Sequence, residues 1–168
     1  MNIEIFPLEK IVIDGSEIFL GTERSAVESV IGKGQTIGTR CYYFNNEMAI
    51  DYKNNKAEFI EFLGGVDGIL KPTVYGISAF DVNADELAEV LKANNNGNIC
   101  DNENGYSYQF ANISVGVYRE AVPEEVEEMI EEAKSFGNPM SDEDIQYEMK
   151  RAIHWATIGV GVAGYYQR

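Results

Sequence analysis

The sequence predicts an α+β fold: an antiparallel sheet with two helix–β-meander units, followed by two acidic amphipathic helices and a glycine-rich last strand. Three observations support this prediction. Short apolar runs alternate with segments of helical spacing, the order helix, strand, strand recurs after roughly 60 residues, and residues 120–148 combine helical spacing with dense acidic charge. A chain of 168 residues suits one domain, so we expect residues 1–168 to form a single domain.

The first half of the chain predicts three short strands, a helix and a meander. Asp14-Gly15 is a strong turn signal between strands. The helix has apolar residues at helical spacing between positions 26 and 31, and Gly32 is a natural end for it. Asparagine pairs then separate three apolar runs, and asparagine tolerates the left-handed backbone of tight hairpins. The expected strands lie at 3–6, 11–13, 18–20, 41–44, 48–52 and 57–63.

The second half predicts a similar series of elements. Apolar alternation favours a strand, and the segment after it has three apolar residues on one helical face. Two further alternating runs flank Ala111-Asn112 as a hairpin. The expected elements are a strand at 74–80, a helix within 83–97, and hairpin strands at 106–110 and 113–118.

The similar order of the two halves predicts an internal repeat formed by residues 18–63 and 77–118. In such a repeat Cys41 and Cys100 occupy equivalent places, because each follows its helix at a similar distance. One mixed α+β domain with coincidental spacing is the alternative.

Near the end of the chain, Gly159, Gly161 and Gly164 match the G-x-G-x-x-G fingerprint of dinucleotide-binding folds. That fingerprint works only between a strand and a helix, because the pyrophosphate rests on the helix N-terminus. The four residues after Gly164 are too few for that helix. Ile158 and Val160 alternate with glycines, so we expect a buried strand inside the sheet that contains all three glycines and binds no nucleotide.

Acidic charge is concentrated in residues 120–148, which hold eleven acidic side chains against one basic side chain, Lys134. This segment carries −10 of the total formal charge of −15. One interpretation is a solvated helical face, and the other is a docking surface for a cationic protein. A glycosidase pair of carboxylates is not favoured, because exposed helix carboxylates lack the shelter that separates their pKa values. The candidate partner-binding residues are Glu124, Glu125, Glu127, Glu128, Glu131, Glu132, Asp142, Glu143, Asp144 and Glu148.

Two amphipathic helices are expected in this acidic segment, at 123–136 and 141–152. Ser141 is a suitable N-cap for the second helix. The apolar stripe of the first helix, which includes Met129 and Phe136, should be buried.

Charge and composition exclude several classes of partner. The chain has 28 acidic and 13 basic residues, so it repels nucleic acid and anionic lipid and attracts basic proteins. The sequence contains no signal-peptide pattern and no membrane-spanning apolar stretch, so we expect a cytoplasmic protein with no membrane partner. Cys41 and Cys100 should then be reduced thiols.

The sequence contains no strong catalytic or metal-binding pattern. Two cysteines and the single histidine, His154, are too few for a zinc site, and a Ser-His-Asp or Cys-His arrangement would depend on His154. Asp101-x-Glu103-x-Gly105 resembles a calcium loop but lacks its required glycine position and terminal Glu, so 93–105 is expected to be a solvated loop. We therefore expect no metal, no cofactor and no enzymatic activity.

Three stretches, "FLGTERSAVESVIG", "YYFNNEMAIDYKNN" and "IGVGVAGYY", resemble small acidic immunity proteins of bacterial toxin systems. The resemblance implies a cytosolic protein that binds and blocks a cognate toxin, often a nuclease. Over residues 11–118, the helix–meander pattern also looks like the fold of the beta-lactamase inhibitor protein, which is built from two such repeats. Neither resemblance assigns a functional residue.

These observations favour a non-enzymatic immunity or inhibitor protein that binds a basic toxin or enzyme through its acidic patch. The alternative is a small-molecule or peptide-binding domain that uses the sheet face and some of the ten tyrosines. An enzyme whose site the sequence does not reveal is a third hypothesis. A deep apolar pocket would favour the second hypothesis, and a neighbouring gene that encodes a basic C-terminal domain would favour the first.

Overall fold

The computed structural model describes residues 1–167 and confirms the α+β class. Its strands form two mostly antiparallel sheets, where the sequence led us to expect one. In the smaller sheet, β1 pairs with β8 in parallel, and the other neighbours are antiparallel. The order of its strands is β3 (Ser16–Phe19), β2 (Lys10–Ile13), β1 (Ile3–Phe6), β8 (Pro72–Val74) and β9 (Ile77–Ser78).

The larger sheet has eight antiparallel strands, and the glycine-rich last strand lies inside it rather than at an edge. It therefore joins the two halves of the chain into one sheet. The order of the strands is β10 (Cys100–Asp101), β11 (Ser107–Phe110), β12 (Val115–Tyr118), β13 (Thr157–Gly161), β7 (Lys56–Phe62), β6 (Met48–Lys53), β5 (Arg40–Tyr43) and β4 (Gln35–Ile37).

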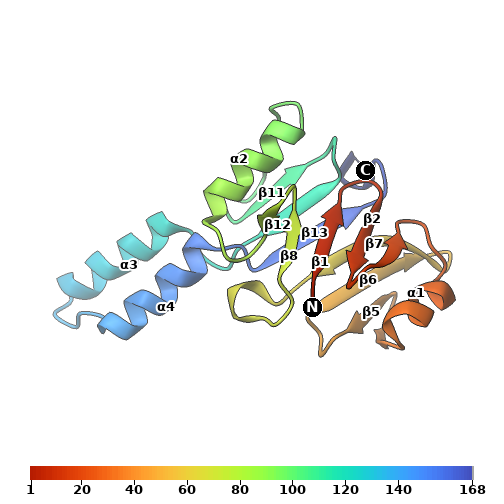
Figure 1. Cartoon of the computed structure of the whole chain (residues 1–168). Helices are drawn as coiled ribbons and strands as arrows, with labels where there is room; N and C mark the ends of the chain where they lie inside the picture. Colours follow the sequence, from red (N-terminus) through yellow and green to blue (C-terminus); the bar gives the residue numbers. More distant parts are fainter. Residues whose placement is uncertain (168) are drawn as a thin grey trace.

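Residues 1–167 form four α-helices, and two of these helices leave the body of the molecule. In Figure 1, α1 and α2 lie beside the strands, whereas α3 and α4 form a hairpin that projects away from both sheets. Short 3₁₀ turns occupy Gly65–Asp67 and Tyr165–Gln167. The helices are α1 (Arg24–Ile31), α2 (Ala84–Asn94), α3 (Pro123–Ser135) and α4 (Asp142–Ile153).

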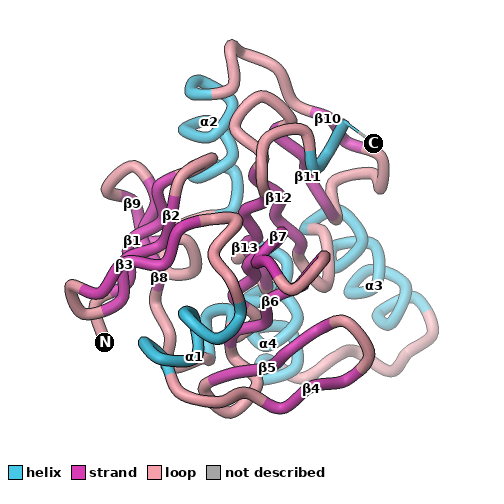
Figure 2. Tube along the Cα trace, turned by 90° about the vertical axis from the view of Figure 1, so that its right-hand side faces the viewer, coloured by secondary structure: helices cyan, strands magenta, loops and turns pink. Residues whose placement is uncertain are grey.

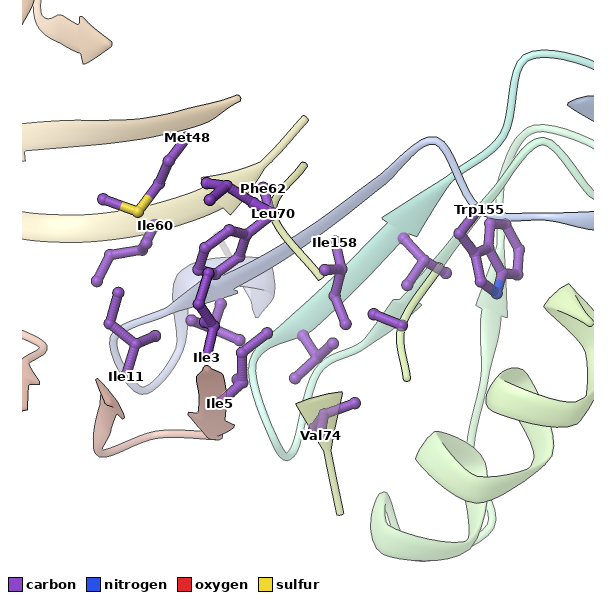
Figure 3. Packing of buried hydrophobic residues seen from close by; sticks show 14 of the residues in the cluster. Ile3, Ile5, Ile11, Met48, Ile60, Phe62, Leu70, Val74, Trp155 and Ile158 are labelled. Carbon is purple, nitrogen blue, oxygen red and sulfur yellow. The ribbon is translucent and has the colours of Figure 1, made fainter. Parts of the chain in front are cut away.

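The main core lies between the two sheets. Residues that alternate along a strand project to the same face, so each sheet can present one apolar face to the other. Figure 3 shows side chains of the smaller sheet packed beside side chains of the larger one. The buried residues in this layer include Ile3, Ile5 and Ile11 from the smaller sheet, and Met48, Ile60, Phe62 and Ile158 from the larger sheet.

Most predicted elements of the first half are confirmed within two residues, but the strand expected at 74–80 is wrong. The chain turns there instead, with φ of 51° at Tyr75 and 76° at Gly76, so that β8 and β9 form a hairpin. Two consecutive residues with positive φ are typical of tight hairpin turns. The short strands β4 and β10 were also missed, and β10 falls within the segment expected to be a solvated loop.

The two cysteines are free thiols that occupy comparable positions in the sheet but different environments. Cys41 lies on β5 and Cys100 on β10, and each of these strands is the third one counted outward from β13. Cys41 is buried in the core, whereas Cys100 is exposed. The internal repeat over 18–63 and 77–118 stays a prediction.

The glycine-rich tail forms a central strand, and its glycines make room for aromatic rings. Ile158 and Val160 are fully buried, as predicted. A Cβ atom at Gly159 would collide with the Phe59 ring, which stacks on Tyr165 with ring centroids 4.5 Å apart. Gly164 lies beyond the strand in a turn with φ of 78°, which corrects its expected place in the strand.

Candidate functional site

The predicted acidic residues lie on the α3–α4 hairpin, and local sequence explains why it forms. Pro123 occupies the first turn of α3, where its missing N–H group costs nothing. Ser141 caps α4, because its Oγ accepts a hydrogen bond from the Asp144 N–H at 3.1 Å. Gly137, with φ of 74°, turns the chain after α3. Both helices lie within one residue of their expected bounds.

A buried arginine holds the root of the hairpin against the body. Arg119, which is 5% exposed, donates hydrogen bonds from Nε to the Gly105 carbonyl at 2.8 Å and from Nη1 to the Ala152 carbonyl at 2.9 Å. Its guanidinium also lies 5.3 Å from the ring centroid of Trp155. Trp155 in turn donates from Nε1 to the Ala84 carbonyl of α2 at 2.8 Å. This network joins the end of β12, the end of α4 and the start of α2.

Basic side chains of α4 make further contacts at the root. Lys150 donates a hydrogen bond to Asp67, and this bond lowers the pKa of the Asp67 carboxyl. Arg151 pairs with Glu120 at 2.8 Å and with Glu148 at 2.9 Å. These bases are therefore neutralised locally, and most of the uncompensated charge lies farther along the hairpin.

The outer surface of the hairpin is strongly anionic, and all ten candidate residues lie on it. Nine are exposed and Glu148 is half-buried. Four have partners: Glu125 accepts from the Tyr106 hydroxyl, Glu131 pairs with Lys134, Asp144 contacts Ser141, and Glu148 pairs with Arg151. The remaining six make no side-chain hydrogen bond or ion pair with any residue that the structure describes: Glu124, Glu127, Glu128, Glu132, Asp142 and Glu143.

The apolar stripe of α3 is buried only near the root, which corrects the expectation of a continuously buried stripe. A small cluster that includes Val126 and Ala152 fills the space between the two helices. Farther out, Met129 is 38% exposed and Phe136 is 79% exposed, and Tyr147 on α4 is 59% exposed. A two-helix hairpin has no third element to cover these side chains. Its far end therefore combines exposed aromatic groups with acidic ones.

Other residues considered in the sequence have structural roles. The Nδ1 atom of His154 lies 3.0 Å from the Val82 carbonyl and links the end of α4 to the body. The Oδ1 atom of Asp101 accepts hydrogen bonds from the N–H groups of Glu103 and Gly105, which shapes the turn that resembled a calcium loop. Within residues 1–167, no group of three or more His, Cys, Asp and Glu side chains is placed to hold a metal ion.

Sequence analysis missed the residues that position the hairpin. Arg119 and Trp155 belong to no motif, and an arginine beside an acidic segment resembles an ordinary surface residue. Only the folded chain brings Arg119 beside the end of α4, 33 residues away in sequence. The one feature of the sequence that could have pointed to a packed junction here is the single tryptophan, which directly follows His154.

Comparisons with family models, curated proteins and solved structures find no match to this chain. Function is therefore inferred from the residues and their geometry. In the described part of the chain, no helix has the length and apolar character needed to cross a membrane.

Proposed function

We propose that this chain is a non-enzymatic immunity or inhibitor protein of the bacterial cytoplasm that binds and neutralises a cognate basic toxin or enzyme. The observation that carries the proposal is the α3–α4 hairpin, which bears six carboxylates without partners among the described residues together with exposed aromatic side chains. The hairpin extends away from both sheets, so a partner can approach it from several directions (Figure 1).

Electrostatics favours a basic partner for this surface. Like charges at this density repel one another and destabilise the folded chain, and a cationic partner relieves that repulsion. A complementary field also raises association rates, which suits rapid neutralisation of a toxin. Because exposed charges are screened over about 8–10 Å at physiological ionic strength, this attraction should depend strongly on salt.

The exposed apolar residues of the hairpin can anchor a bound partner, which charge alone does not do. Aromatic and methionine side chains are enriched in the cores of protein interfaces, whereas the rim is polar and accessible to solvent. Phe136, Tyr147 and Met129 are therefore suitable anchors within an acidic border. Steering by the carboxylates and anchoring by these three residues are separable contributions, the first to association and the second to dissociation.

The decisive experiment uses the product of the gene adjacent to the one that encodes this chain. We expect that product to carry a basic C-terminal domain that arrests bacterial growth, and we expect co-expression of this chain to restore growth. Reversal of Glu124, Glu127, Glu128 and Glu131 to Lys should slow association at least about tenfold. Biolayer interferometry between about 50 and 300 mM NaCl measures that rate.

A matched control separates the patch from net charge. Reversal of four exposed carboxylates on the body changes total charge equally but should slow association much less. An association rate that is unchanged by salt and by both sets of reversals would reject the acidic patch as the binding surface. An adjacent gene that encodes no toxic basic product would reject the immunity role. The control residues are Glu4, Glu9, Glu86 and Glu89.

A further inference from the structure

The open face of the eight-stranded sheet contains a hollow of about 200 Å³ that the acidic hairpin does not form. Strand register explains its lining. Gly116 on β12 lies opposite Gln109 on one side and Gly159 on the other, and Gly159 lies opposite Glu61 on β7. Residues opposite one another project to the same face, so these four lie in one row across the sheet.

Two glycines on this face of the sheet leave room for aromatic side chains. A Cβ atom at Gly116 would collide with the hydroxyl of Tyr166, so only glycine lets this tyrosine extend across the strand. Gly159 likewise accommodates the Phe59 ring. The 3₁₀ turn Tyr165–Gln167 thus builds one wall of the hollow from the end of the chain.

The walls are rich in polar groups that have no partner. The side chains of Ser107, Gln109, Thr157 and Tyr166 are half-buried, and none makes a side-chain hydrogen bond with another residue that the structure describes. Because these groups are accessible and are not engaged by the rest of the chain, they are available to hydrogen-bond an incoming ligand.

The charge around the hollow is negative. Glu61 pairs with Arg40, but Arg40 also faces Asp51, with Nε and Oδ1 3.8 Å apart, so two carboxylates share one guanidinium. Asp51 lies outside the lining, and burial raises the pKa of its carboxyl, with Glu61 raising it further against the opposing effect of Arg40. A further wall residue, Glu103, is exposed and has no ion pair among the described residues.

An aromatic ring completes the lining. Tyr118, which is 41% exposed, borders the hollow on β12, directly before the segment that leads into α3. A cation over an aromatic face is attracted by the ring quadrupole. Carboxylates, hydroxyl and amide acceptors and an aromatic ring are together the chemistry that recognises an ammonium or guanidinium group.

We propose that this hollow receives a lysine or arginine side chain of the basic partner, an inference that rests on the function proposed above. Its volume falls below the roughly 300–1,000 Å³ of small-molecule sites, so it suits a single side chain. Figure 2 shows α3 on the side of the eight-stranded sheet that faces away from the five-stranded sheet, which is the side of the hollow. Tyr106, which directly precedes the lining residue Ser107, also donates a hydrogen bond to Glu125 of α3, so one partner can contact the hairpin and the hollow together.

The test is an NMR titration of the ¹⁵N-labelled full chain with N-acetyl-L-argininamide. The control ligand is N-acetyl-L-citrullinamide, which has nearly the same shape and no charge. We expect argininamide to shift the amide signals of Gln109, Gly116, Tyr118 and Thr157 in a saturable manner, and citrullinamide to leave them in place. Tyr118→Ala and Glu103→Gln should each weaken binding about threefold, and the double variant about tenfold.

Glu128→Gln on the hairpin is the matched charge control and should leave this affinity unchanged. Shifts confined to hairpin residues, equal shifts with citrullinamide, or the same affinity in the double variant would each overturn the inference. The proposed function is tested separately. If a basic partner binds but argininamide shifts no signal of the hollow, only the hollow is rejected. If argininamide binds saturably but no basic partner exists, only the immunity role is rejected.

Discussion

The two-sheet body and the α3–α4 hairpin differ most in what covers their apolar side chains. Phe62 on β7 is fully buried between the sheets, whereas Phe136 at the end of α3 is 79% exposed. Both residues belong to the apolar face of an amphipathic element. The comparison teaches that periodicity identifies an apolar face, but another element must be present to bury it.

The largest expected effect tests this comparison directly. Phe62→Ala should lower the free energy of unfolding by about 3–5 kcal/mol, because it leaves a cavity in a packed core. Phe136→Ala should lower it by less than about 0.5 kcal/mol, because the ring is already hydrated. Urea denaturation measures both values. Comparable losses would mean that the hairpin end is covered in solution, for example by a second copy of the chain.

The next largest loss of stability is expected at the junction between the two-sheet body and the hairpin. Arg119→Ala should cost about 2–4 kcal/mol, because it leaves the Gly105 and Ala152 carbonyls without their buried donor. Hydrogen exchange should also accelerate in α3 and α4 more than in β7. Arg151→Ala, which removes partly exposed ion pairs on the same helix, should cost less than about 1 kcal/mol. Equal losses in the two variants would contradict the role of Arg119 as the anchor.

Within the body, a substitution on the open face of the sheet should lower the free energy of unfolding by less than a substitution in the core. Gly159→Ala should cost about 1–3 kcal/mol, because the added methyl group meets the Phe59 ring. In the Phe59→Ala background the same change should cost much less, so a double-mutant cycle isolates the contact. Additive losses would show that Gly159 is needed for backbone conformation rather than for the ring.

The smallest expected effect concerns two carboxyls with opposite pKa shifts. The raised pKa of Asp51 means that its stabilising contribution is present below the unfolded pKa and lost as pH rises through the folded value. Asp51→Asn should therefore gain stability relative to the wild type between about pH 3 and pH 7, by less than about 1 kcal/mol.

Asp67, which pairs with Lys150 at the junction, should behave in the opposite way. Its pKa is lowered, so its contribution is present above the unfolded pKa and is lost as pH falls through the folded value. Asp67→Asn should be less stable than the wild type near neutral pH and should approach it in acid. Urea denaturation at several pH values measures the stability of each variant relative to the wild type. If this difference changed with pH in the same direction for both variants, the environments assigned to the two carboxyls would be contradicted.

Local patterns predicted much of the fold and part of the site. The alternation of Ile158 and Val160 with glycines identified a buried strand, and Pro123 and Ser141 marked the starts of the acidic helices. The turn at Tyr75-Gly76 was missed, because a tyrosine gives little local sign of a left-handed conformation. The hollow on the sheet face was also missed, since its lining comes from β7, β11, β12, β13 and the end of the chain.

The sequence by itself determined the α+β class, most strand and helix positions, and the concentration of charge in 120–148, because periodicity, turn chemistry and charge are local properties. Only the tertiary structure decided that the strands divide into two sheets, that Arg119 fixes the hairpin, and that Phe136 stays exposed. These features depend on contacts between segments far apart in the chain. Which segments meet is set by how the apolar faces of the whole molecule can be covered together, and no short stretch of sequence contains that information.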